Sequence, residues 1–232
     1  MKMRNLLLLG ALIMTSGGMM AQTSLTSTKA HVVPGYESQD VATISFQVPA
    51  TIGGWQMVLS LPEGLSLVEG TADVTVNGQT EKGSAFEGVT PSSLHKSHKI
   101  LGGTNKDGDA VLICFPTTAD AALSAQSGQL CTIKVKAEES FAGTGQVTVK
   151  SFLAADPDGS TTQYTMESPI TFDVVALKGD VNSNGKINSA DISAIVREML
   201  NSAGNTKADV NGNGKVNSAD ITAVVREILS LN

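Results

Sequence analysis

The sequence predicts a mainly β protein, with an N-terminal β-sandwich followed by a small α-helical C-terminal domain built from two loop–helix repeats. Three observations lead to this fold class. Between residues 22 and 175, short runs alternate apolar and polar side chains and are separated by segments rich in Gly, Asn, Asp and Ser. No helical period extends through that region. From Gly179 onward the pattern changes to a duplicated polar run, and an amphipathic helix follows each copy.

The first 21 residues are expected to be a secretory signal peptide. Lys2 and Arg4 supply a positive segment, residues 6–14 (LLLLGALIM) are apolar, and small residues precede a cleavage site that we place after Ala21. The apolar run is too short to span a bilayer as a helix, so no transmembrane segment is expected in the mature chain. The mature protein is therefore expected to be secreted, either extracellular or at the cell surface.

The region 22–175 is expected to contain about seven to nine short strands, for which a sandwich is the usual architecture. In VATISFQV (41–48) every second residue from Ala42 to Val48 is apolar, and WQMVLSL (55–61) alternates in the same way from Trp55. A turn at Pro62–Gly64 precedes a further short strand. The remaining expected strands are DVTVNG (73–78), AVLICF (110–115), LCTIKVKA (130–137), QVTVKSFLA (146–154) and PITFDVV (169–175).

The charge balance argues against a nucleic-acid partner. The chain has 16 Lys and Arg against 22 Asp and Glu, a net charge of −6, whereas phosphate binding requires clustered cations. The two cysteines, Cys114 and Cys131, both lie on expected strands. They either form a disulfide or remain as two buried thiols, and the sequence leaves these alternatives open.

Several side chains of chemical interest in the β region are interpreted as structural. His95 and His98 in SLHKSHK lack a third metal ligand at a suitable spacing, so an exposed loop is expected. Trp55 could stack on a sugar, but it alternates in register with other apolar residues and is expected in the core.

Two pairs of acidic residues are interpreted as turns rather than as metal or acid–base pairs. They are Asp107 with Asp109 and Asp156 with Asp158. The chain also lacks a nucleophile elbow, an HExxH motif and a Gly-rich phosphate loop before a helix. We therefore expect a protein that is not an enzyme.

The C-terminal region is an internal duplication. Residues 180–200 and 209–229 are identical at 16 of 21 positions, and the five differences are conservative. Each polar run is followed by apolar residues on one face of a helix, so two packed units are expected to bury both stripes. The residues of the two stripes are Ile192, Ile195, Val196, Met199 and Leu200, and Ile221, Val224, Val225, Ile228 and Leu229.

The duplicated runs DVNSNGKINSAD and DVNGNGKVNSAD have the spacing of calcium-binding loops. Side-chain oxygens occur at positions one, three, five and nine, a glycine allows the sharp turn at six, and a carboxylate closes the loop at twelve. Position seven contributes only its backbone carbonyl, so a lysine is tolerated there. The expected ligands are Asp180, Asn182, Asn184, Lys186, Asn188 and Asp191 in the first loop, and Asp209, Asn211, Asn213, Lys215, Asn217 and Asp220 in the second.

The loops differ from a general EF-hand because the twelfth residue is Asp rather than Glu and no clear helix precedes either loop. In these respects residues 179–232 resemble a type I dockerin, whose two F-hand-like repeats lack the entering helix. Residues 22–175 are similar to a cohesin-like sandwich in the segments ISFQVP, GGWQMVLSLPEGL and LCTIKVKA. Residues 176–178 are then expected to be a short linker.

The resemblance implies that two Ca²⁺ ions order the loops and that the paired helices then bind a cohesin-like module, in another protein or in the same chain. Partner contacts in the family come from positions ten, eleven and eighteen of each repeat, although a solvated helix face remains the alternative for the two arginines. Many dockerins have Ser-Thr at ten and eleven, and the alanines here leave partner specificity open. The corresponding residues are Ser189, Ala190 and Arg197, and Ser218, Ala219 and Arg226.

The resemblance also implies a biological setting, an extracellular complex that degrades polysaccharides. In the alternative interpretation, the sandwich itself binds polysaccharide and the C-terminal domain is only its anchor.

Overall fold

The computed structural model describes residues 22–76, 78–119, 121–158 and 163–231, so the expected signal peptide lies outside the described residues. Within these ranges no helix has the length and apolar character needed to cross a bilayer. The strands are β1 (Ser24–Ser27), β2 (Ala30–Val32), β3 (Ala42–Gln47), β4 (Gly54–Ser60), β5 (Leu65–Ser66), β6 (Glu69–Val76), β7 (Gln79–Phe86), β8 (Val89–Pro91), β9 (His98–Thr104), β10 (Ala110–Pro116), β11 (Ser127–Ile133), β12 (Lys136–Ala137), β13 (Thr144–Ala155), β14 (Gln163–Thr165) and β15 (Ile170–Ala176). The helices are α1 (Ser189–Asn201), the 3₁₀ helix η1 (Thr206–Ala208) and α2 (Ser218–Ser230).

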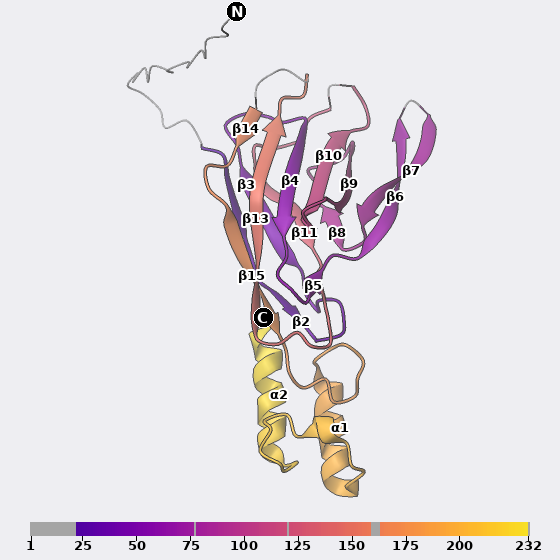
Figure 1. Ribbon diagram of the computed structural model, residues 1–232, viewed down its shortest axis with the longest axis vertical. Coiled ribbons are helices and arrows are strands. Elements are labelled where there is room, and N and C mark those ends of the chain that lie inside the picture. The colour runs from indigo at the N-terminus through magenta and orange to yellow at the C-terminus, as the bar shows by residue number, and fades with distance from the viewer. Residues whose placement is uncertain (1–21, 77, 120, 159–162, 232) are drawn as a thin grey trace, which may run out of the picture.

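The strands form a sandwich of two main sheets (Figure 1). One sheet has four strands in the order β1-β3-β11-β8, and the other has seven, in the order β2-β15-β13-β4-β10-β9 with β14 added beside β13. Most pairs are antiparallel, but β2 and β15 run parallel. The predicted fold class, mainly β with a sandwich and two C-terminal helices, is confirmed.

The core lies between the two sheets and follows the predicted alternation. Ala42, Ile44 and Phe46 of β3 face the core from one sheet, and Met57 and Leu59 of β4 face it from the other. Successive side chains of a strand point to opposite faces, so in β3 and β4 one face is buried and the other is more exposed. A single apolar cluster, to which both sheets contribute, holds the sandwich together.

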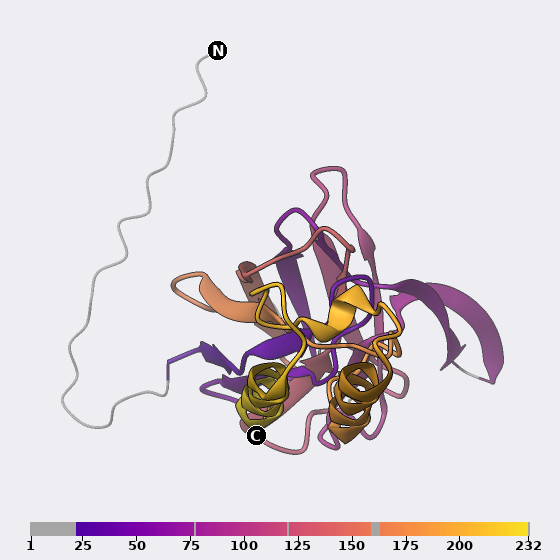
Figure 2. The ribbon, with the colours of Figure 1, turned by 90° about the horizontal axis from the view of Figure 1, so that it is seen from below.

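A long hairpin formed by β6 and β7 projects from the side of the sandwich (Figures 1 and 2). The sequence predicted a strand within β6 but not its partner β7, which is almost entirely polar and exposed. β7 contacts β9 of the main sheet, and Gly83 of β7 lies against Leu101 of β9. β7 thus pairs with β6 and also contacts β9, and local apolar patterning does not reveal either contact.

The expectation that His95 and His98 lie in an exposed loop is wrong, because both side chains are buried. Trp55 is buried as predicted, and its Nε1 donates a hydrogen bond of 3.0 Å to Nε2 of His95. Nε2 of His98 lies 2.8 Å from the carbonyl oxygen of Gly53. Both histidines are buried beside partners more than 30 residues away in sequence, and these partners bond to Nε2 of each ring. Nδ1 of His98 is buried without a hydrogen bond in the described part of the chain.

The two cysteines are free thiols buried in the sandwich, which selects one of the two alternatives that the sequence left open. Burial raises the pKa of both thiols, that of Cys131 to about 12. The reactive thiolate is therefore negligible at neutral pH, and both residues act as small apolar side chains.

The acidic pairs have structural partners. Asp107 lies in a turn, where its backbone N–H donates to Oδ1 of Asn105, and the carboxylate of Asp109 accepts hydrogen bonds of 2.8 Å from Nζ of Lys150. Asp156 accepts a hydrogen bond of 2.8 Å from the hydroxyl of Tyr164. Asp107 thus lies in a turn, as predicted, while the carboxylates of Asp109 and Asp156 are bonded to Lys150 and Tyr164.

The parallel pair β2–β15 directs the chain from the sandwich into the C-terminal repeats. Ala176 ends β15, and the backbone N–H of Leu177 continues the pairing with a 2.8 Å bond to the carbonyl oxygen of Val32. The expected linker 176–178 is thus held against the sandwich. α1 and α2 lie side by side at this end of the molecule (Figures 1 and 2), and α2 runs back so that the C-terminus lies near the sandwich.

The stability of the sandwich is expected to decrease on acidification because of His95. Burial, assisted by the neighbouring His98, lowers the pKa of the His95 imidazole below its ordinary value of 6.5. As the pH falls below 6.5, the unfolded chain binds a proton at His95 that the folded state does not bind. The free energy of unfolding therefore falls, by at most about 1.4 kcal/mol per pH unit for one proton. Urea unfolding between about pH 7.5 and pH 5.5, followed by the fluorescence of Trp55, measures this slope. The matched control is His95→Gln, which keeps a polar side chain but does not titrate, and an equal slope in this variant would contradict the assignment.

Candidate calcium site

The first expected calcium loop is closed by its own polar side chains. Oδ1 and Oδ2 of Asp180 accept hydrogen bonds of 2.9 Å each from the backbone N–H groups of Asn184 and Gly185. Oδ1 of Asn182 also accepts from the N–H of Asn184, at 3.1 Å, and Oδ1 of Asn184 accepts from the N–H of Lys186 at 2.9 Å. The side chains at positions one and three therefore converge on the same backbone group inside the loop.

Asp191 joins the two ends of this loop and begins the helix that follows. Its side chain is fully buried, with 0% exposure. Oδ1 accepts from the N–H groups of Val181 and Asn182 at 3.0 and 3.2 Å, and Oδ2 accepts from the N–H of Asn188 at 2.9 Å. The side chain of Asn188 accepts from the N–H of Ala190 at 2.8 Å. Asn188 and Asp191 together form a capping box at the start of α1.

The second loop repeats these contacts. Asp209 accepts from the N–H groups of Asn213 and Gly214 at 3.0 and 2.7 Å. Asp220 is also fully buried and accepts from the N–H groups of Asn211 and Asn217 at 3.1 and 2.9 Å. As in the first loop, the side chain at position nine caps the following helix. The duplication in sequence is therefore also a duplication in structure.

The donor set of each loop has the chemistry that Ca²⁺ prefers, because it consists of carboxylate and amide oxygens. Only two of the side chains in each loop are carboxylates, and accordingly no group of three His, Cys, Asp or Glu residues is found in the described part of the chain. Asp191 and Asp220 are buried carboxylates, and across the described ranges neither has a Lys, Arg or His in an ion pair. A buried charge of this kind is stabilised by a nearby cation.

Residues 178–229 match the family model described as the dockerin type I domain. This segment is a type I dockerin domain. Domains of this family bind calcium, in agreement with the chemistry of the two loops. The match does not include the sandwich, and no curated protein matches the chain.

Several solved structures of cohesin modules resemble this chain at low sequence identity. One is a type I cohesin–dockerin complex from Clostridium thermocellum, with a TM-score of 0.46 and 14% identity, covering 68% of this chain and 100% of that chain. Another is the sixth cohesin of scaffoldin B from Acetivibrio cellulolyticus, in complex with a dockerin, with a TM-score of 0.45, 11% identity and coverage of 67% and 99%. A third is a cohesin module from a family 33 glycoside hydrolase of Clostridium perfringens, with a TM-score of 0.44, 8% identity and coverage of 68% and 99%. At these scores the likenesses by themselves assign neither a partner nor an activity to the sandwich.

The expected partner-binding residues of the dockerin domain all lie on its surface. Ser189, Ala190 and Arg197 are exposed in the first repeat, and Ser218, Ala219 and Arg226 are exposed in the second. The two sets occupy equivalent positions on α1 and α2, with the serine and alanine at the start of each helix and the arginine near its middle. The structure thus leaves both copies accessible to a partner.

The expectation that the helices bury their whole apolar stripes against each other is wrong. Ile195 and Val224 are fully buried, but Val196, Met199, Leu200, Val225 and Leu229 are exposed, with Leu200 at 79% and Leu229 at 66%. Two helices of thirteen residues cover only part of one another, so a wide stripe cannot be buried entirely. Val196 precedes Arg197 and Leu200 follows it by three positions, and Val225 and Leu229 are placed in the same way around Arg226. Each helix therefore presents apolar and cationic side chains together, a surface that sequence reasoning missed.

A second apolar surface lies on the outer face of the seven-stranded sheet. A hollow there is bounded by β4, β10 and β13, and its lining includes Ile113, Phe115, Leu153 and Pro157. Ile113 is 44% exposed although it lies in the middle of β10. Alternation in the sequence marks these residues as facing away from the core, but it does not distinguish a solvated face from a binding face.

The two candidate loops differ in their surroundings at the glycine of position six. Gly185 has φ 75° and Gly214 has φ 79°, a conformation that favours glycine. A Cβ atom on Gly185 would overlap the ring of Tyr36, whereas a Cβ atom on Gly214 would meet no atom within 4 Å. The first loop is therefore packed against the sandwich, and the second is open.

This difference leads to a matched pair of substitutions. Gly214→Ala is expected to lower the free energy of unfolding of the dockerin domain by about 1–2 kcal/mol, because of the left-handed backbone alone. Gly185→Ala is expected to lower it further, because the Tyr36 ring must also move. Urea unfolding followed by the helical circular dichroism signal, with calcium present, compares the two variants. Equal effects would contradict the packing of Tyr36 on the first loop.

Proposed function

We propose that this chain is a secreted, non-catalytic assembly protein, whose dockerin domain binds two Ca²⁺ ions and attaches the sandwich to a cohesin-like module. The observation that carries the proposal is the duplicated convergence of carboxylate and amide oxygens in loops that each lead directly into a helix. A cation held in each loop supplies positive charge beside the buried Asp191 and Asp220. Their contacts with the loop backbone and the helix start then hold α1 and α2 in a defined position.

The partner is proposed to bind to the exposed surface of the helices. There, Arg197 and Arg226 supply a directional charge, while the adjacent apolar residues, such as Leu200 and Leu229, supply area that is removed from water on binding. Interfaces commonly combine an apolar centre with an arginine anchor, so this composition supports a protein partner rather than a small ligand.

The contacts of the dockerin domain support a partner in another molecule rather than the same chain. The domain follows the end of β15, and this end pairs with the start of β13, because Thr144 lies opposite Val175. The apolar hollow is lined by residues at the opposite end of β13, which is twelve residues long and thus spans about 35 Å. The dockerin domain would have to leave its contacts with the sandwich in order to reach the hollow in its own chain.

The alternative that the sandwich binds polysaccharide loses its candidate platform, because Trp55 is buried and bonded to His95. A role in an extracellular complex that degrades polysaccharides is still proposed, and it rests on the family resemblance of the dockerin domain.

Calcium binding by both loops is tested with the double variant Asp180→Ala, Asp209→Ala. Each carboxylate accepts two backbone hydrogen bonds in its loop, so the variant is expected to lose calcium uptake and the calcium-dependent gain in helical signal. Calorimetry and circular dichroism measure the two quantities. Asp73 forms an exposed ion pair with Lys82 on the distant hairpin, so Asp73→Ala is a suitable control for the loss of a carboxylate. Unchanged calcium uptake in the double variant would contradict the assignment.

Partner binding is tested with a calcium-dependent pull-down on the purified cohesin-like modules of the parent organism. Replacing both Arg197 and Arg226 with Ala is expected to weaken binding by at least about tenfold, the effect of losing a buried, hydrogen-bonded charge. Each single variant is expected to lose less binding affinity, because the other helix keeps its own arginine and neighbouring contact residues. Calcium uptake serves as the control and should not change. Full binding by the double variant would exclude these helix faces as the contact.

A further inference from the structure

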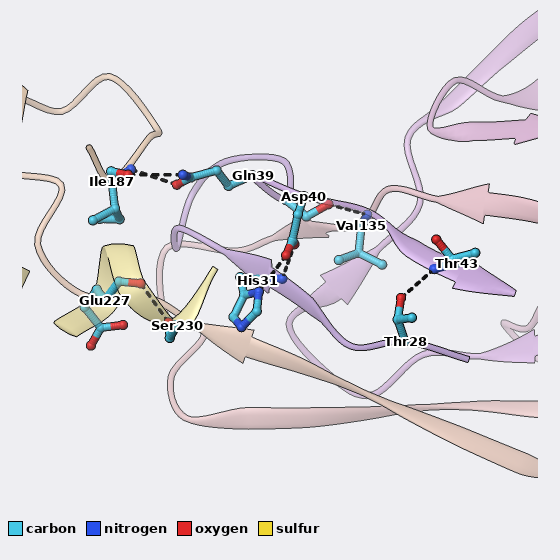
Figure 3. Close-up of polar contacts among 10 residues, drawn as sticks. Thr28, His31, Gln39, Asp40, Thr43, Val135, Ile187, Glu227 and Ser230 are labelled. Carbon is cyan, nitrogen blue, oxygen red and sulfur yellow. Dashed lines mark hydrogen bonds and ion pairs between the residues drawn. The ribbon is translucent and has the colours of Figure 1, made fainter. Parts of the chain in front are cut away.

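A glutamine from the sandwich is hydrogen-bonded to the backbone of the first calcium loop. Gln39, in the segment 33–39 that follows β2, donates from Nε2 to the carbonyl oxygen of Ile187 at 3.1 Å. Its Oε1 accepts from the N–H of the same residue at 2.7 Å. One side-chain amide thus satisfies both backbone groups of Ile187, as a neighbouring strand would (Figure 3).

A second residue of the segment 33–39 covers the other side of this loop. The hydroxyl of Tyr36 donates to the carbonyl oxygen of Ser183 at 3.0 Å, and its ring lies over Gly185. Val33, from the start of the segment, is buried in the same apolar cluster as Ile187 and Ile195. The sandwich therefore contributes to the first loop through polar contacts, ring packing and a shared core.

The segment between the two repeats adds further contacts to the first loop. Nζ of Lys207 donates to Oγ of Ser183 at 2.7 Å, and Nδ2 of Asn205 donates to the carbonyl oxygen of Val181 at 3.1 Å. Ser183 has a left-handed backbone with φ 59°, whereas the second repeat has Gly212 at this position. The contacts of Ser183 hold the loop in a conformation that a non-glycine residue rarely adopts.

The second loop has no equivalent support. Val216 corresponds to Ile187, and among the described residues its backbone groups have no hydrogen bond to the sandwich. Gly214 is exposed, whereas its counterpart Gly185 is buried. The loop precedes α2, whose other end lies near the sandwich, so the second loop lies at the distal end of the molecule (Figure 1).

We propose that the segment 33–39 is an integral part of the first calcium site, so that the two sites are unequal and the first binds Ca²⁺ more tightly. This inference rests on the proposed function, in which each loop binds one ion. The sandwich holds the first loop near its closed conformation before the ion arrives. Less ordering is then required on binding, whereas the second loop must be ordered by the ion itself.

The same contacts couple calcium binding to the attachment of the two domains. If Gln39 and Tyr36 favour the calcium-bound form of the first loop, calcium must favour their contacts to the same degree, because the coupling is reciprocal. At intermediate calcium concentrations the first repeat is therefore filled and docked on the sandwich, while the second repeat is still empty.

Tyr36 allows the two sites to be measured separately. Tb³⁺ occupies calcium sites because it also prefers oxygen ligands, and it emits when a nearby tyrosine is excited. The chain has two tyrosines and one tryptophan, and of these Tyr36 packs on the first loop. Tyrosine-sensitised Tb³⁺ emission from the full chain thus reports the first site, while calcium calorimetry reports both.

The decisive variant is Gln39→Ala, with Glu37→Gln as the control in the same segment. Glu37 forms an ion pair with Lys134 of the sandwich, 3.6 Å away. Loss of the two hydrogen bonds to Ile187 is expected to raise the midpoint of the Tyr36-sensitised titration about tenfold, equivalent to about 1.4 kcal/mol. Asp209→Ala is expected to leave this titration unchanged. Asp180→Ala is expected to abolish the emission and to leave one weaker calcium site, which Gln39→Ala does not alter.

Other results would overturn the inference. Two equal calcium sites in the unmodified chain, or a Gln39→Ala midpoint equal to that of the unmodified chain, would exclude a role of the sandwich while leaving the proposed function intact. No calcium uptake at either site would overturn the proposed function as well. Retained helical signal in Gln39→Ala with calcium verifies that the variant is folded.

Discussion

The main constraint on the C-terminal domain is that it has too few apolar side chains to fold by burial alone. Seven apolar side chains form its buried cluster in the described residues, and one of them, Val33, comes from the sandwich. Domains of this size generally need an additional stabilising element, such as a bound metal or a partner surface. In the proposed function the polar loops provide the metal ligands and the sandwich provides the surface, so the order of both helices depends on contacts outside the helices themselves.

The sandwich could be predicted where side-chain alternation reflects burial on one face. The β3 and β4 patterns predicted both strands and their buried residues, including Trp55. The same logic failed for β7, which is polar on both faces, and for His95 and His98. Their local sequence is that of a polar loop, whereas their partners Trp55 and Gly53 come from another part of the chain. Local patterns carry no information about such long-range partners.

The candidate site could be predicted to a similar extent. The spacing of acidic and amide residues indicated two loops, and the structure brings the side chains at positions one, three and twelve onto the backbone of each loop. The spacing did not reveal that the loops are unequal, because Gln39 lies 148 residues from Ile187 in sequence. It also did not reveal how much of each helical stripe remains exposed. That outcome depends on the length and packing of both helices, and not on the period of either one.

The pairing of β15 determines how the molecule responds to tension. The dockerin domain is joined directly to the end of β15, and this strand is hydrogen-bonded to β13 on one side and to β2 on the other. A pull on the dockerin domain acts along the strand, whereas ladder hydrogen bonds lie across it. The load is therefore shared by many bonds in shear, instead of opening them one after another. When the chain is pulled by its C-terminal domain, β15 would therefore stay paired under forces that would peel a strand from an edge.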